Sequence, residues 1–353
     1  MSTHSLTVAA ALEILAYHAA EADERAAWPE ESWSALVRSG VLRWSVPSEY
    51  GGDGRSALEA LQGYPTLAAA CLTTCFLLSQ RDAAVRRLRD SPNESLRRKL
   101  LPPLANGECF ATVGLSQLTT SRQHTKPALM AQLVGDRVVL DGVMPWVTGA
   151  ARADYFVTGA ALDDGRQILV VVPRDSVGLI VEKPLELAAL NGSLTAEVRC
   201  KSAEVDSSWL LCPPAEQVMT SGRGGTGGLE TSALAAGLAR AATDYLLREA
   251  KLRPEWVDTA AACDRSTNAL WDSIVSLAQS GGSPQAAADV RAQANTLVLR
   301  AAQLALAAAK GAGFLKNHPA QRYARQALFF LVWSCPRPAL EGTLANLQPV
   351  CDE

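Results

Sequence analysis

Residues 39–54, SGVLRWSVPSEYGGDG, place a cluster of Pro, Ser, Gly and Asp between two long stretches with helical spacing. Apolar residues recur at helical intervals in SLTVAAALEILAYHAAEA (5–22) before the cluster and in ALEALQGYPTLAAACLTTCFLLSQRDAAVRRL (57–88) after it. Gly, Pro, Ser and Asp favour turns, so the cluster interrupts the helices without ending the helical region. Residues 1–108 are therefore predicted to form an α-helical domain.

The character of the sequence changes near Cys109. Short runs rich in Val, Ile, Phe and Tyr are separated by Gly, Asp, Asn and Pro, which is typical of strands joined by turns. These runs are AQLVGDRVVLDG (131–142), DYFVTGAAL (154–162), RQILVVVP (166–173) and TAEVRCKSAEV (195–205). We expect residues 109–220 to form a central antiparallel β-domain.

A third region begins with SGRGGTGG (221–228) and continues as Ala- and Leu-rich helical sequence almost to the end. No Lys-Ser or Lys-Thr follows these glycines and no buried strand precedes them, so a hinge or helix lead-in is favoured over a phosphate-binding loop. Residues 221–353 are predicted to form a helical bundle. Helices, then strands, then helices is an α+β order, unlike the alternation of a parallel doubly wound sheet.

Composition excludes several classes of protein. The chain has 353 residues, of which 20% are charged, and a net charge of -3 with both signs interspersed. Without a basic stripe to neutralise phosphates, no nucleic-acid partner is expected. The longest apolar runs, such as ALFFLVW (327–333), are far shorter than the ~20 residues of a membrane span. Since no basic start precedes an apolar leader, a cytoplasmic location is expected.

The histidines and cysteines do not predict a metal site. The four histidines are dispersed, and the eight cysteines form no paired CxxC units. Cys71 and Cys75 stand four residues apart on one face of an apolar helix, which favours core packing over a redox pair.

Five blocks of the sequence, in order along the chain, resemble the acyl-CoA dehydrogenase family. They are residues 39–54, KLLPPLANGE (99–108), DGVMPWVTGAARADYFVTGA (141–160), GLIVEKPLELAALNGSLTAEV (178–198) and KGAGFLKNHPAQRYARQA (310–327). Their ordered occurrence on the predicted regions is more specific than any single block. The chain is therefore identified as a divergent member, and an acyl-CoA dehydrogenase-like fold is expected.

The resemblance implies FAD, bound between the β-domain and the C-terminal helices with an acyl thioester against it. Trp146 matches the family's aromatic residue beside the flavin ring, and Thr148 matches the hydroxyl near its reactive nitrogen. The alternative is that both are ordinary strand residues. Ser116 matches the Thr of the flavin loop, which reads SQLTTSRQ (116–123) here. Arg122 replaces a phosphate-contacting Ser, and either pairs with the diphosphate or is a solvated charge.

The resemblance also implies that a partner subunit supplies the second flavin wall, so a homodimer or homotetramer is expected. Gly311 and Gly313 match glycines that let the backbone approach the cofactor, although Lys310 stands where the family has its first Gly. Arg253 takes the place of a phosphate-binding Arg. Pro254 departs from the pattern and predicts that the preceding helix ends early.

Two glutamates are candidates for the catalytic base. Dehydrogenation requires a carboxylate that removes the α-proton of the substrate. The family's usual position falls on Ser334, which cannot act as an ordinary base. Glu341 occurs in LEGT (340–343), seven residues later, either as an equivalent or by chance. Glu230, in ETSALAAG (230–237), matches members that carry the base on the first bundle helix, or is a first-turn acid favoured by the helix dipole.

The implied activity is α,β-dehydrogenation of an acyl thioester, bound to CoA or to a carrier protein, with an unidentified electron acceptor. Two alternatives share the fold. A flavin-dependent monooxygenase would need no α-proton base, which fits the missing Glu at position 334. A catalytically silent member would fit the departures at the flavin loop and at Lys310.

Overall fold

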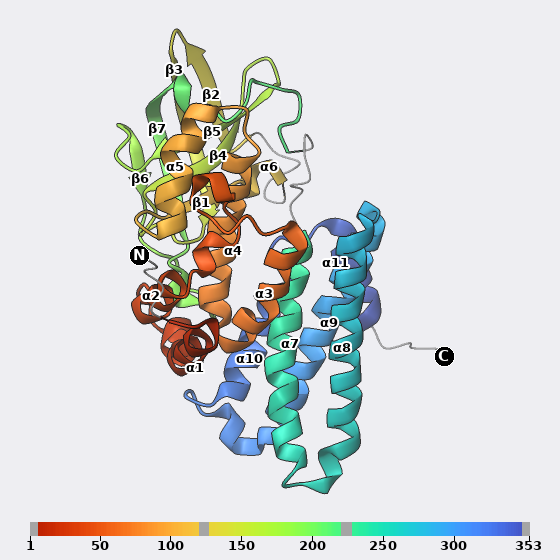
Figure 1. Ribbon diagram of the computed structural model, residues 1–353. Coiled ribbons are helices and arrows are strands. Elements are labelled where there is room, and N and C mark those ends of the chain that lie inside the picture. The colour runs from red at the N-terminus through yellow and green to blue at the C-terminus, as the bar shows by residue number, and fades with distance from the viewer. Residues whose placement is uncertain (1–5, 120–126, 220–227, 348–353) are drawn as a thin grey trace.

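The computed structural model describes residues 6–119, 127–219 and 228–347, and the structural statements below refer to these residues. Helices form both ends of the chain and a sheet forms its middle (Figure 1). This order confirms the α+β class predicted from the sequence. The boundaries at 108/109 and 220/221 remain predictions.

The N-terminal helices begin where the sequence supplies caps. Ser56 and Glu59 form a reciprocal capping box at the start of α3, in which Ser56 N donates to Glu59 Oε2 at 2.8 Å and Glu59 N donates to Ser56 Oγ at 3.2 Å. The elements of this region are α1 (Val8–Glu24), α2 (Glu30–Arg38), η1 (Val41–Arg43), η2 (Ser48–Tyr50), α3 (Ala57–Ala70), α4 (Leu72–Arg89) and α5 (Glu94–Asn106).

The turn cluster of residues 39–54 folds back on itself between α2 and α3. Arg43 Nε lies 3.1 Å from Asp53 Oδ1, which joins the two ends of the cluster. A Cβ on Gly52 would lie only 1.9 Å from the carbonyl oxygen of Val46, so no other residue fits this approach. Steric exclusion of any side chain therefore explains why this turn cluster has glycine at position 52.

The central region is a seven-stranded sheet over the described residues, ordered β1-β4-β2-β3-β7-β6, with β5 paired to β4. Its strands are β1 (Ala111–Gly114), β2 (Leu129–Val134), β3 (Arg137–Val147), β4 (Tyr155–Ala161), β5 (Gln167–Pro173), β6 (Leu179–Val181) and β7 (Ala196–Asp206). The short helical elements are α6 (Ser116–Thr119), η3 (Asn191–Ser193) and η4 (Ser207–Trp209).

Most neighbouring strands are antiparallel, as expected, but β1 and β2 both lie parallel to β4. The chain leaves β1 and reaches β4 only after the β2–β3 hairpin, so β4 can return in the same direction as β1. The sheet is consequently mixed.

The C-terminal region is a bundle of long helices that lies beside α3 (Figure 1). Its elements are α7 (Leu229–Ala250), η5 (Pro254–Trp256), α8 (Val257–Ser280), α9 (Pro284–Ala309), η6 (Lys310–Phe314), α10 (Pro319–Phe329) and α11 (Arg337–Leu347). As Pro254 predicted, α7 ends before it.

One apolar core joins the three regions. Trp28 and Trp33 of the first region meet Phe110, just before β1, edge to face at centroid distances of 5.2 Å. On the other side, α3 and α7 touch backbone to backbone, because a Cβ on Gly237 would lie 2.5 Å from the carbonyl oxygen of Pro65. Cys71, between α3 and α4, and Cys75, on α4, are both core residues, and burial raises the pKa of both thiols.

Within the described residues, one helical stretch, Pro284–Phe314, is long and apolar enough to cross a membrane by length and composition alone. Most of it is α9, which packs against α7, α8, α10 and α11. The same composition is expected of the central helix of a bundle.

Candidate functional site

The sheet presents one exposed aromatic side chain at the end of β3. The pairing of β3 with β7 is irregular between Met144 and Val147, whose side chains are buried. Trp146 lies between them and is 53% exposed. Thr148 follows directly after β3, two residues beyond Trp146, and is buried. A planar ligand could therefore stack on the exposed indole.

Thr148 is itself held from two sides. Thr112 Oγ1, on β1, donates to the Thr148 carbonyl oxygen at 2.6 Å, and Thr195 Oγ1, just before β7, donates to Thr148 Oγ1 at 3.4 Å. All three residues are buried. Thr112 thus holds the backbone of Thr148, whereas Thr195 contacts its hydroxyl.

Ser116 begins the short helix α6 directly after β1. Its neighbour Gln117 donates through Nε2 to the carbonyl oxygens of Gly114 and Gly159, at 2.9 and 3.0 Å. Gln117 Oε1 is buried and has no hydrogen-bond partner. A buried orphan acceptor often marks a group that a ligand or water satisfies. The other loop residue predicted from the sequence, Arg122, lies outside the described residues.

Glu230 lies in the first turn of α7, where its carboxylate Oε1 is 3.1 Å from Arg86 Nη1 of α4. The two side chains are 31% and 29% exposed. Burial acts to lower the pKa of Arg86, but Glu230, Tyr64 and Asp82 outweigh it, so this pKa is raised above its usual value. The helix N-terminus adds positive partial charge on the same carboxylate.

Behind Arg86 lies a buried polar cluster that sequence reasoning missed. The Tyr64 hydroxyl donates to Asp82 Oδ2 at 2.8 Å, and Arg81 Nη1 donates to Asp82 Oδ1 at 2.6 Å. Burial, with Asp82 nearby, raises the pKa of Tyr64 well above its usual value. The available signal was the i,i+4 spacing of Asp82 and Arg86 on α4.

Glu341 occupies a different environment on α11. Its Oε1 accepts from Arg337 Nε at 2.7 Å, one turn earlier on the same helix. The two side chains are 60% and 88% exposed. Such a pair is typical of a solvated helix face.

The residues expected to face a partner's flavin gather at the far end of the bundle. Arg253 follows α7 and donates through Nη2 to Glu249 and to the carbonyl oxygen of Ala308. Gly311 faces open space, whereas a Cβ on Gly313 would lie 2.5 Å from that of Ala309. Lys310 has a φ of 53°, a left-handed conformation that favours the Gly found in the family.

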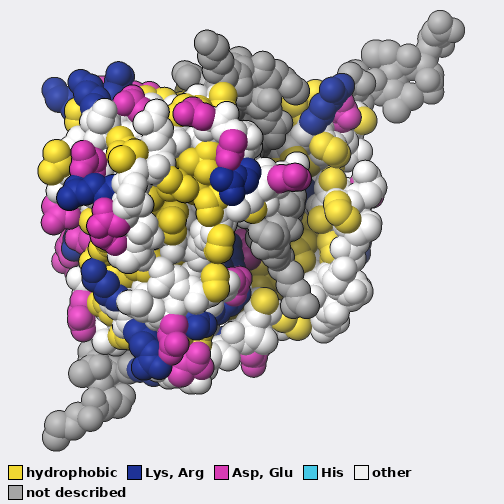
Figure 2. All heavy atoms as spheres, turned by 90° about the horizontal axis from the view of Figure 1, so that it is seen from above, with side chains coloured by type: hydrophobic (Ala, Val, Ile, Leu, Met, Phe, Trp, Pro, Cys, Tyr) yellow, Lys and Arg dark blue, Asp and Glu magenta, His cyan; other side chains and the backbone are white. Residues whose placement is uncertain are grey.

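The predicted site residues thus form two groups. α7 has 22 residues, so its ends lie about 33 Å apart. Glu230 is at the end that Figure 1 shows near the sheet, whereas Arg253 follows the opposite end. Seen from above the sheet, the molecule carries Lys and Arg side chains interleaved with Asp and Glu (Figure 2).

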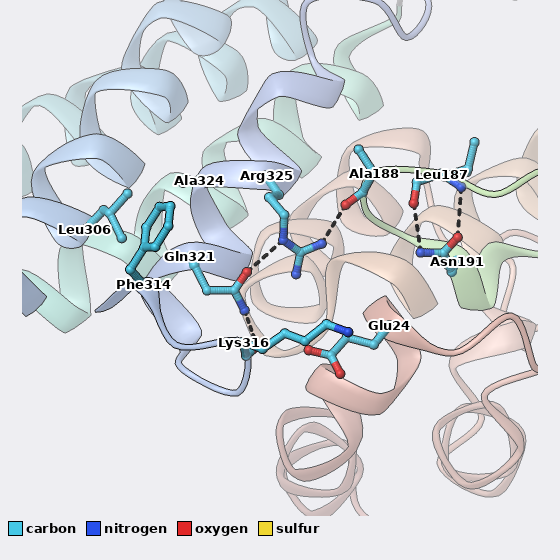
Figure 3. Close-up of a pocket in the computed structure, with 10 residues that line it drawn as sticks. All are labelled: Glu24, Leu187, Ala188, Asn191, Leu306, Phe314, Lys316, Gln321, Ala324 and Arg325. Carbon is cyan, nitrogen blue, oxygen red and sulfur yellow. Dashed lines mark hydrogen bonds between the residues drawn. The ribbon is translucent and has the colours of Figure 1, made fainter. Parts of the chain in front are cut away.

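A hollow of about 530 Å³ lies between α1, α10 and the loop before η3 (Figure 3). Arg325 points into it, donates to the carbonyl oxygen of Ala188 at 2.7 Å, and pairs with the buried Asp23 carboxylate at 2.7 Å. The cation is therefore already neutralised, and the contacts tie α10 to α1 and to this loop. Within the described residues, no group of three or more His, Cys, Asp or Glu is placed to bind a metal.

Comparison with solved structures defines the class of fold. Butyryl-CoA dehydrogenase from Megasphaera elsdenii superposes with a TM-score of 0.83 over 96% of this chain and 94% of that chain, at 19% identity. The prolyl acyl carrier protein oxidase AnaB superposes with a TM-score of 0.81 over 96% of this chain and 97% of that chain, at 17% identity. The fold is therefore that of the acyl-CoA dehydrogenases, as predicted.

Sequence comparison gives matches to the same family. The family model described as "Acyl-CoA dehydrogenase, N-terminal domain" matches residues 6–108. The probable acyl-CoA dehydrogenase YngJ of Bacillus subtilis (strain 168) is 25% identical over 340 residues, covering 89% of this chain and 88% of that protein. Together with the fold, these similarities support the resemblance to the acyl-CoA dehydrogenase family that the sequence indicated.

Proposed function

We propose that the protein is an FAD-dependent oxidoreductase that removes the α and β hydrogens of an acyl thioester. The observations that carry this proposal are the exposed Trp146 indole at the end of β3, with the Thr148 hydroxyl two residues further on, and Glu230 at the end of α7 that lies near the sheet. When bound, FAD would supply the acceptor for the hydride. The family supports this chemistry in general terms.

The residues at the sheet fit a flavin ring chemically. An isoalloxazine has a planar face, hydrogen-bond acceptors and an N–H donor, and the structure offers an exposed indole, a threonine hydroxyl and the unpartnered Gln117 Oε1. The phosphate end fits less well within one chain, because Arg253 is already paired with Glu249. In line with the family resemblance, we propose that Gly311, Gly313 and Arg253 face the flavin of a second subunit in a homodimer or homotetramer.

Exposed apolar side chains support this assembly. Phe314 is 83% exposed and Leu315 is also exposed, directly after Gly313. A large exposed aromatic residue beside a glycine-rich turn is expected to lose water contact in a subunit interface.

We assign removal of the α-proton of the substrate to Glu230 rather than to Glu341. Glu230 lies at the sheet end of α7, is two-thirds buried and faces groups from α3 and α4, whereas Glu341 projects into solvent on α11. Withdrawal from water allows a carboxylate to act on a bound substrate without competition from solvent. The acyl carrier is either CoA or a carrier protein, the two kinds named for the compared structures. We also propose a cytoplasmic location.

One spectroscopic experiment tests the proposal. The visible spectrum of the purified protein is recorded with FAD before and after anaerobic addition of acyl-CoA thioesters and of acyl-carrier-protein thioesters. Bleaching by a thioester supports dehydrogenation, and the carrier that bleaches faster identifies the substrate class. Bleaching only by an added reductant, followed by consumption of oxygen, supports the monooxygenase alternative. Protein that takes up no FAD would be a catalytically silent member.

A second experiment tests whether the Trp146 indole contacts FAD. Trp146→Ala should weaken FAD retention by about tenfold, because the stacked indole contributes roughly 1–1.5 kcal/mol beyond its area. Trp271→Ala, which alters a tryptophan on α8, is the matched control. Full flavin occupancy in Trp146→Ala would remove this residue from the site.

A further inference from the structure

Thr148 belongs to a row of buried hydroxyl groups. Ser193 Oγ lies 2.9 Å from Thr195 Oγ1, and Thr195 Oγ1 donates to Thr148 Oγ1 at 3.4 Å. Ser193 is fully buried, and Thr195 and Thr148 are nearly so. We call Ser193, Thr195 and Thr148 the hydroxyl row.

The direction of the Thr195–Thr148 bond determines what the Thr148 hydroxyl can do. A hydroxyl carries one proton and two acceptor lone pairs. Thr148 Oγ1 is the acceptor in this bond, so its own proton is not used there. Among the residues that the structure describes, Thr148 Oγ1 donates to no protein group. Its proton is thus available to a ligand.

The turn that carries the row is held in an unfavourable backbone conformation. Leu190 has a φ of 64° and Leu194 a φ of 48°, on either side of η3. Left-handed conformations are costly for a leucine and persist only where the surroundings enforce them. Here the buried Asp23 Oδ1 accepts from Leu190 N at 2.8 Å, and the Ser193 carbonyl oxygen accepts from Gly149 N at 2.7 Å. The turn is therefore anchored both to α1 and to the residue after Thr148.

We propose that Thr195, supported by Ser193, is a positioning residue that directs the Thr148 proton towards the bound flavin. By donating to Thr148 Oγ1, it leaves the outward direction as the place for that proton. Successive hydroxyl donors also polarise one another, which strengthens the last donor in the row. The inference rests on the proposed function, since it requires flavin bound beside Trp146.

The test measures how tightly the protein binds oxidised FAD and how tightly it binds reduced FAD, and compares the two affinities. Thr195→Val keeps the shape of the side chain and removes its hydroxyl, so Thr148 is free to turn its proton inward. We expect the preference for reduced over oxidised FAD to fall about tenfold, which corresponds to a reduction potential lower by ~30 mV for a two-electron couple. Thr195→Ser, which keeps the hydroxyl, should stay within about twofold of the wild type.

Two further variants separate positioning from packing. Thr112→Val removes a bond to the Thr148 carbonyl oxygen and leaves the Thr148 hydroxyl bonded to Thr195. It should lower the melting temperature without changing the preference for reduced FAD. Ser193→Ala should shift that preference about twofold to threefold in the same direction as Thr195→Val. It therefore tests the contribution of the hydroxyl row to FAD binding even if Thr195→Val does not fold.

A double-mutant cycle gives the decisive result. In a Thr148→Val background, Thr195→Val should have no further effect on the ratio of the two FAD affinities. If Thr195→Val weakens both redox forms equally, or acts independently of Thr148, the positioning role is wrong and the row is only structural. A wild-type protein that binds no FAD would overturn both this inference and the proposed function, whereas FAD binding with an unchanged ratio in both variants overturns the inference alone.

Discussion

Glu230 and Glu341 stand in equally suggestive sequence contexts but in opposite environments. Glu230 meets an arginine from another helix, and that arginine is backed by a buried tyrosine and aspartate. Glu341 meets an arginine of its own helix in solvent. A local motif records which residues are neighbours in the chain, whereas the chemistry of a carboxylate depends on what packs against it.

The largest expected effect is on substrate-driven flavin reduction. Glu230→Gln keeps the size of the side chain but cannot accept the α-proton, so bleaching by an acyl thioester should slow by about 10²–10⁴-fold. Glu341→Gln should remain within about twofold of the wild type. Stopped-flow absorbance under anaerobic conditions measures both. Normal bleaching in Glu230→Gln, with loss in Glu341→Gln, would reverse the assignment.

The second effect concerns stability. Arg86→Met should lower the free energy of unfolding by about 2–3 kcal/mol, because it leaves the Glu230 carboxylate without its partner in a largely buried setting. Arg337→Met, the matched change at the Glu341 pair, should leave the unfolding midpoint unchanged. Urea denaturation at pH 7 compares them. Equal losses in the two variants would contradict the environmental difference described above.

The smallest effect is a change in alkaline stability. Tyr64→Phe removes the hydrogen bond to Asp82 and should cost about 1.5 kcal/mol at pH 7. The pKa of Tyr64 is raised in the fold above its usual value of 10.0. Its contribution is therefore fully present below that value and declines as pH rises above it, because the unfolded chain then releases the proton.

Urea midpoints measured from pH 8 to pH 11 test this expectation. The wild type should lose stability more steeply than Tyr64→Phe above pH ~10, so the difference between the two should narrow. Parallel curves across the whole range would show that Tyr64 ionises as easily in the fold as in the unfolded chain.

The fold was largely predictable because its signals are local. Helical spacing, the turn cluster of residues 39–54 and the strand runs each depend on nearby residues, and the structure places helices and strands accordingly. The parallel pairing of β1 with β4 was missed, since the periodicity of a strand does not identify its neighbours.

The site was less predictable because its contacts join distant parts of the chain. Arg86 reaches Glu230 across 144 positions (230 − 86), and Thr195 reaches Thr148 across 47. Sequence reasoning marked Glu230 and Thr148 through family resemblance, yet it offered no sign that Arg86 or Thr195 would stand beside them. The hydroxyl row is especially hidden, because Ser and Thr are frequent in strands and turns for reasons unrelated to function.

The contact at Gly237 limits how this protein can be divided. The segment that matches the family model ends at residue 108 and so includes α3 but not α7. At Gly237, however, α3 and α7 leave no room for a side chain between their backbones. A fragment comprising only that segment would expose the apolar surface of α3 that α7 normally covers. The recognisable N-terminal part is consequently not a module that could be exchanged or expressed alone, and recombination between relatives should succeed only when α3 and α7 are inherited together.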